Sequence, residues 1–139
     1  MTRLLGIDYG TKRIGIAVSD ALGITVTPVK VIHRKTEVQD IEEIRKLVED
    51  KEAEKIVIGY PLNMNGTPGR LIQEIEAFAE KVKAATGVAI DFCDERLTSY
   101  EAESFLINKA DMSREKRKEV KDKIAACLIL QTYLEKNKP

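Results

Sequence analysis

A chain of 139 residues is long enough for one ordinary domain with its own core, and we expect a single domain over residues 1–139. The chain is 43% hydrophobic and 33% charged, which excludes a disordered or fibrous protein. Lys plus Arg and Asp plus Glu each number 23, so net charge does not indicate a nucleic-acid partner and local charge has to be examined. No apolar stretch approaches the roughly 18 residues of a membrane span, and the N-terminus has no signal-peptide pattern. We therefore expect a cytoplasmic protein without a membrane partner.

Three short runs rich in β-branched residues begin the chain, at residues 4–8, 14–18 and 24–32. The turn-like segments between them, residues 10–13 and 20–23, are short enough for hairpins, so we predict a three-stranded antiparallel meander. Apolar residues then recur at helical spacing over residues 37–51. Residues 55–60 form a compact apolar run, which is typical of a strand covered on both faces.

The second half of the chain alternates helix and strand. Its periodicity predicts a helix that begins near Leu71 and ends at Gly87, and then a fifth strand over residues 88–93. A short helix is expected over residues 99–108 and a last helix over about residues 114–136. Strand–helix–strand connections imply parallel pairing, so we predict an α/β fold with a mixed five-stranded sheet and helices on both faces. Such sheets bind ligands at the carboxyl ends of their parallel strands.

Acidic residues stand where this architecture can bring them together. Asp8 ends the first strand, and Asp94 and Glu95 follow the fifth. Asp122 shares one face of the last helix with Ala125, Ala126, Ile129 and Tyr133. Because the two alanines allow a close approach of helix and sheet, we expect Asp122 to point toward the sheet. Strict alternation along the fifth strand puts Asp94 and Glu95 on opposite faces, and spacing alone does not decide between them.

Carboxylates that converge from separate elements repel one another unless a cation lies among them. Mg²⁺ or Mn²⁺ is the cation that suits such a group of acids, because carboxylate and water oxygens are the preferred ligands of these ions. Two such ions about 3.5–4 Å apart are the usual apparatus for in-line attack on a phosphodiester. We therefore predict a metal site with ligands from Asp8, Asp94, Glu95 and Asp122. Each acid also has an ordinary interpretation when it is taken alone, as a turn former, a partner of Arg96 or an early-helix acid.

Basic residues accompany these acids. Residues 109–123 hold seven cations against four acids, and the first third of the chain holds Arg3, Lys12, Arg13, His33, Arg34 and Lys35. Cations around an acidic pocket suit a phosphate backbone, although a solvated helical face with i, i+4 pairs has the same pattern. The loop GYPLNMNGTPG, residues 59–69, contains Asn63 and offers backbone amides to a phosphate, as any strand-to-helix connection would.

Four stretches of the chain together resemble the YqgF family, also called RuvX: GIDYGTKRIGIAVSD, IVIGYPLNMNG, DERLTSYEAE and KDKIAACLILQTYL. The resemblance implies a ribonuclease-H-like fold and a cytoplasmic nuclease that matures the 5′ end of pre-16S rRNA, with Holliday junction resolution as the alternative. It maps the family's acidic positions onto Asp8, Glu95 and Asp122, and it implies substrate contacts by Lys12, Arg13, Arg96 and Thr98. The chain departs from the pattern at residues 60–63, which hold no acid, and at Asn65, where family members often have Asp.

Two further functions fit parts of the sequence. The stretch GIDYGTK also resembles the first phosphate loop of the actin, sugar-kinase and Hsp70 ATPases, but those proteins need two such domains and a second glycine-rich loop. A non-catalytic RNA-binding factor would keep the fold without the chemistry. For the nuclease, we expect structured RNA such as pre-rRNA, or branched DNA, as the partner, and a monomer or weak homodimer. Symmetric junction cutting would favour a two-fold dimer.

Overall fold

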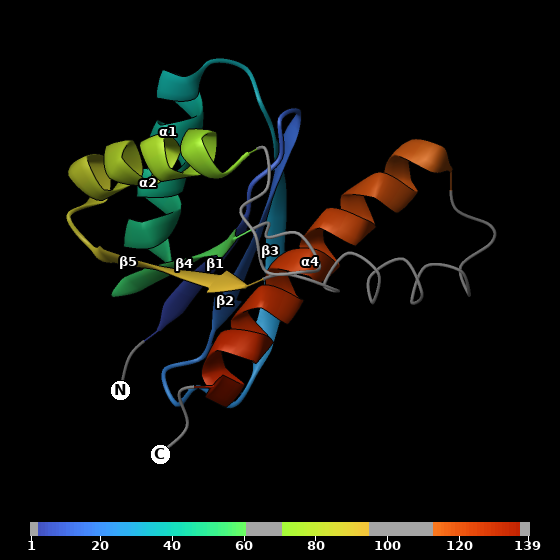
Figure 1. The fold of residues 1–139 in the computed structure, drawn as a ribbon. Helices are drawn as coiled ribbons and strands as arrows, with labels where there is room; N and C mark the ends of the chain where they lie inside the picture. The colour runs from blue at the N-terminus through green and yellow to red at the C-terminus, as the bar shows by residue number, and fades with distance from the viewer. Residues whose placement is uncertain (1–2, 61–70, 95–112, 137–139) are drawn as a thin grey trace.

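The computed structural model describes residues 3–60, 71–94 and 113–136. Five strands form one mixed sheet in the order β3-β2-β1-β4-β5 (Figure 1). Strands β1 (Leu4–Asp8), β2 (Arg13–Ser19) and β3 (Val26–His33) pair antiparallel. Strand β4 (Lys55–Tyr60) pairs parallel with β1, and β5 (Ala89–Asp94) pairs parallel with β4. The predicted meander and the predicted parallel pairing are therefore both confirmed.

Helices cover both faces of the sheet, as predicted (Figure 1). Helix α1 (Glu37–Asp50) and helix α2 (Ile72–Thr86) pack on one face over a core of aliphatic side chains and Phe78. Helix α4 (Arg114–Lys136) crosses the other face. Gly87 ends α2 in the left-handed conformation, with a φ of 74°, as the sequence predicted. The short helix expected over residues 99–108 lies outside the described residues, and no helix of the described segments is long and apolar enough to span a bilayer.

Most predicted boundaries agree to within one residue, but the third strand begins at Val26 and not at Ile24. The Asp20 carboxylate accepts a hydrogen bond from the amide of Ile24 at 2.8 Å, and the amide of Asp20 donates to the carbonyl of Thr25 at 3.1 Å. These bonds close a loop that leaves the Ile24 side chain exposed. The local polar turn therefore prevails over the apolar, β-branched character of Ile24.

Helix α4 lies close against β1 and β2 because small residues line both sides of the contact. A Cβ atom on Gly15 would overlap the carbonyl oxygen of Asp122, and a Cβ atom on Gly6 would collide with Leu130 and approach the carbonyl of Ala126. Ala125 and Ala126 are buried, as expected for the helix side of this contact. The matching strand glycines were not predicted, although glycine inside a strand often marks a close approach of another backbone.

Strand β3 forms one edge of the sheet. It contains Pro28, which pairs with Ala17 of β2. The β2–β3 register shifts between Ile16 and Ala17, so the pairing at this edge is irregular. Proline lacks an amide hydrogen and is tolerated in sheets at edges and irregularities of this kind.

Candidate functional site

The structure brings Asp8 and Asp122 to one corner of the sheet. Asp8 is the last residue of β1 and lies opposite Gly15 of β2 in the antiparallel register. The backbone of Asp122 packs directly against Gly15. Leu4 and Gly6 contact the α4 side of the sheet, and alternation along β1 puts Asp8 on the same face. Two of the predicted ligands therefore lie on one face, at the carboxyl end of β1.

Asp122 forms an ion pair with Arg13, the first residue of β2. The Nε atom of Arg13 donates to Oδ2 of Asp122 at 2.7 Å, and the two side chains are 26% and 18% exposed. A hydrogen bond between two ionised groups of this length is among the stronger ones in proteins. Arg13, expected to contact substrate, thus contacts one of the predicted metal ligands in this structure. The Asp122 side chain is directed toward β2, as expected.

Asp94 lies on the other face of the sheet. Phe92 of β5 packs edge-on against Tyr60, and Ile90 contacts the core beneath α1 and α2. Cys93 belongs instead to the cluster beneath α4. Alternation from Ile90 through Phe92 therefore places Asp94 opposite to the face that carries Asp8.

The other predicted site residues are outside the described residues: Asn63, Glu95, Arg96 and Thr98. Within the part of the chain that the structure describes, no three Asp, Glu, His or Cys side chains gather closely enough to hold a metal ion. Of the predicted ligands among the described residues, Asp8 and Asp122 lie on one face of the sheet and Asp94 on the other.

Arg34 anchors the turn between β1 and β2. Its Nη1 donates to the carbonyl of Gly10 at 3.1 Å, and its amide donates to the carbonyl of Lys12 at 3.0 Å. Its Nε donates to Oδ2 of Asp40 at 2.9 Å, and its guanidinium lies 4.8 Å from the ring centroid of Tyr9. Asp40 is 2% exposed and the Arg34 side chain is 13% exposed, so this ion pair is largely buried. The network was not predicted, because nothing local distinguishes Asp40 from an ordinary acid in the first turn of a helix.

A basic cavity adjoins the two acids. It has a volume of about 330 Å³ and is lined by Lys12, Arg13, His33, Lys118 and Glu119. The Nε2 atom of His33 lies 2.6 Å from Oε1 of Glu119, and the His33 side chain is 63% exposed. His33, one of the basic residues in the first third of the chain, therefore lies beside α4. Arg13 belongs both to the cavity lining and to the pair with Asp122, so the cavity and the acids are neighbours.

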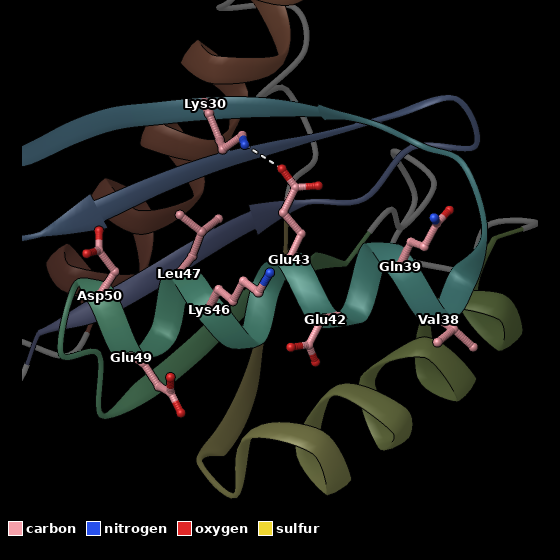
Figure 2. A pocket seen from close by; sticks show the side chains of 9 residues that line it. All are labelled: Lys30, Val38, Gln39, Glu42, Glu43, Lys46, Leu47, Glu49 and Asp50. Carbon is pink, nitrogen blue, oxygen red and sulfur yellow. Dashed lines mark hydrogen bonds and ion pairs between the residues drawn. The ribbon is translucent and has the colours of Figure 1, made fainter.

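A larger cavity, about 1020 Å³, follows α1 beside β3 (Figure 2). Its lining contains four acids and two lysines, and one of those lysines, Lys30, forms an ion pair with Glu43. The side chains in Figure 2 spread around an open helix surface rather than converging on one point. Because an acidic lining repels phosphate and no predicted site residue contributes to it, cavity size does not identify the functional site here.

Comparison with known proteins gives the family. The sequence model described as "RuvX: Holliday junction resolvase" matches residues 2–136. A protein of Endomicrobium trichonymphae is 46% identical over 135 residues, 97% of this chain and 96% of that protein. One of Clostridioides difficile (strain 630) is 48% identical over 133 residues, 96% of this chain and 94% of that protein. Both are named "Putative pre-16S rRNA nuclease".

Solved structures agree on the fold. The structure of T. thermophilus RuvC in complex with a Holliday junction substrate matches with a TM-score of 0.62, covering 99% of this chain and 98% of that one. The two sequences are only 11% identical, so this likeness shows the ribonuclease-H-like resolvase fold and nothing finer. The fold and the family that the sequence motifs implied are both confirmed. The chain belongs to the RuvX family of resolvase-type nucleases, which hydrolyse phosphodiester bonds.

Proposed function

We propose that this protein is a divalent-metal-dependent endonuclease that processes the 5′ end of pre-16S rRNA in the cytoplasm. The observation that carries the proposal is that Asp8 and Asp122 lie on one face of the sheet, each next to Gly15, beside a cavity rich in cations. Acids that can hold a metal, next to cations that can hold a phosphate backbone, are the two components that hydrolysis of a polynucleotide needs. The substrate is proposed from the name shared by the two relatives described above.

The donor set fits Mg²⁺ or Mn²⁺. Asp8 and Asp122 offer carboxylate oxygens from separate elements, which hard divalent cations prefer over nitrogen or sulfur ligands. Glu95 is the proposed third ligand, because the resemblance to the family maps one of its acidic positions onto this residue. Asp94 is the weaker candidate. When bound, such an ion would polarise the phosphoryl group and lower the pKa of a water molecule.

The chain's own residues would bind and orient the substrate. Lys12 is the last residue of the β1–β2 turn and Arg13 begins β2, and the backbone of this turn is already fixed by the hydrogen bonds of Arg34. A turn that is ordered before binding loses little conformational entropy when it holds a phosphate. Arg96, Thr98 and Asn63 are proposed as further contacts to the nucleic acid. In this proposal the protein acts as a single domain over residues 1–139.

The test compares matched substrates. A 5′-extended pre-16S RNA fragment and a four-way DNA junction are incubated with the purified protein, with Mg²⁺, with Mn²⁺ or with a chelator. We expect cleavage of the RNA that requires the metal. Asp8→Asn and Asp122→Asn should abolish it without changing the circular dichroism spectrum, whereas Asp50→Asn, at the exposed end of α1, should cleave as the wild type does. Binding of the RNA without cleavage under every metal condition would favour a non-catalytic RNA-binding factor.

Junction resolution is the second candidate, and the description of the family model favours it. A resolvase must cut two strands symmetrically, which requires two sites related by a two-fold axis. The same incubations test it when combined with sedimentation analysis. Paired symmetric cuts in the junction by a dimer would support resolution. A monomer that cleaves only the RNA would exclude it.

A further inference from the structure

We propose that the basic cavity lined by Lys12, Arg13, His33 and Lys118 binds one backbone phosphate of the nucleic acid, beside the acidic pair but separate from it. The proposal rests on the nuclease function proposed above and adds a position through which the strand passes. It also gives His33 and Lys118 a role that neither the motifs nor the family comparison assigns.

The cavity is built by elements that are distant in the sequence. Lys12 lies in the β1–β2 turn, Arg13 begins β2, and His33 ends β3 opposite Arg13 in the sheet register. Lys118 comes from the first half of α4, which crosses this end of the sheet. Lys116 and Lys118 are both exposed, but only Lys118 lines the cavity, so the interpretation of the basic stretch as a solvated helical face accounts for Lys116. It does not account for the convergence of Lys118 with cations from two strands and a turn.

The charges in the cavity suit a phosphate. Among the described residues that line the cavity, two lysines and one arginine accompany one carboxylate, Glu119, so this lining is positive even when His33 is neutral. Because an ionised carboxylate only accepts hydrogen bonds, the proton between His33 and Glu119 is assigned to Nε2. Glu119 therefore accepts a hydrogen bond from the imidazole at the cavity wall, and Arg13 is already engaged by Asp122. Lys12 and Lys118 are left as the principal phosphate ligands.

This lining predicts binding without sequence preference. Ammonium groups hold phosphates as point charges and carry no information about the base. The cavity would therefore set the position of the strand relative to Asp8 and Asp122, and contacts elsewhere would select the sequence.

The single histidine of the chain gives a direct readout. In untagged, metal-free protein, the imidazole resonances of His33 are followed by NMR during titration with a short single-stranded RNA, and separately with inorganic phosphate at matched ionic strength. We expect the RNA to shift these resonances in the wild type and in Lys116→Gln, and much less in Lys118→Gln. Equal shifts in Lys118→Gln and the wild type would overturn the proposal, as would shifts caused by inorganic phosphate but not by RNA.

Affinity gives a second, independent measurement. Lys118→Gln should weaken RNA binding roughly three- to tenfold at low salt and reduce the slope of log K against log[salt] by about 0.7–0.9. Lys116→Gln should change both much less, and equal losses in the two variants would show diffuse attraction by α4 instead of a defined site.

Neither the NMR titration nor the affinity measurement needs cleavage. RNA that shifts His33 but is never cut would contradict the nuclease proposal alone, whereas cleavage with unchanged affinity in Lys118→Gln would contradict the cavity alone.

Discussion

Arg13 and Asp122, which lie 109 positions apart in the chain, are joined by a 2.7 Å hydrogen-bonded ion pair across the contact between β2 and α4. The guanidinium occupies one of the two Asp122 carboxylate oxygens, Oδ2. A divalent ion that used Asp122 would have to share this carboxylate with Arg13 or displace it. The pair therefore connects the acidic site to the basic cavity, since Arg13 belongs to both.

Replacing Arg13 should strengthen metal binding. In Arg13→Gln the competing cation is gone, and a partly exposed ion pair is worth about 0.2–1 kcal/mol, so the affinity for Mn²⁺ should rise by up to roughly fivefold. Calorimetric titration of metal-free protein with Mn²⁺ measures this change. Arg45→Gln, which breaks an ion pair with Glu42 on α1, is the matched control and should bind Mn²⁺ as the wild type does. An affinity that is unchanged or lower in Arg13→Gln would show that Arg13 does not compete.

Adding one methyl group at Gly15 should disturb the site. In Gly15→Ala the new Cβ would overlap the backbone of Asp122, so α4 has to move away, at a cost of about 1–3 kcal/mol in stability. Metal affinity and RNA cleavage should fall with it. Gly87→Ala is the control: its left-handed φ of 74° costs about 1–2 kcal/mol, but the new methyl group meets nothing within 4 Å. Similar stability losses with full cleavage in both variants would refute the predicted movement of α4.

The buried pair of Arg34 and Asp40 should be important for stability. Asp40→Asn leaves the charge of Arg34 uncompensated in a site where the two side chains are 13% and 3% exposed, and we expect a loss of about 3–5 kcal/mol. Urea unfolding measures the difference, with Asp50→Asn as an exposed control on the same helix. Because Arg34 also holds the β1–β2 turn, RNA affinity should fall in the same variant. A loss below about 1 kcal/mol, typical of surface pairs, would contradict the prediction.

Asp91 should stabilise the fold near neutral pH, and this contribution should be lost in acid. The hydrogen bond donated by Tyr133, and then the contact with Lys55, lower the pKa of Asp91 below its ordinary value. A carboxyl group whose pKa is lower in the folded state stabilises the fold above its unfolded pKa, and this contribution is lost as the pH falls through the folded pKa. The effect should be small, since Asp91 is 47% exposed. Urea midpoints between about pH 5 and about pH 2 should fall less steeply in Asp91→Asn than in the wild type, and equal slopes would exclude the contribution.

The sequence predicted the elements better than the contacts between them. The run KIVIGY gave the bounds of β4 correctly, because an uninterrupted apolar run of that length has one simple interpretation. The position of Asp122 followed from helical periodicity and from two alanines on the same face. The buried partner of Arg34 was missed because Asp40 has the pattern of any acid in a first helical turn. The basic cavity was missed because it depends on the register of Arg13 with His33 and on where α4 crosses the sheet, which no local pattern specifies.

The proline at the outer edge of the sheet restricts how copies of this protein can assemble. Pro28 has no amide hydrogen to donate to a strand from another molecule. The shifted register beside Pro28 also interrupts the regular row of backbone donors and acceptors with which such a strand would pair. Docking of a second sheet along β3 is therefore disfavoured, and with it the uncontrolled growth of fibres from that side. If two copies act together on a branched substrate, continuation of one sheet into the other across β3 is therefore not the expected way for them to join.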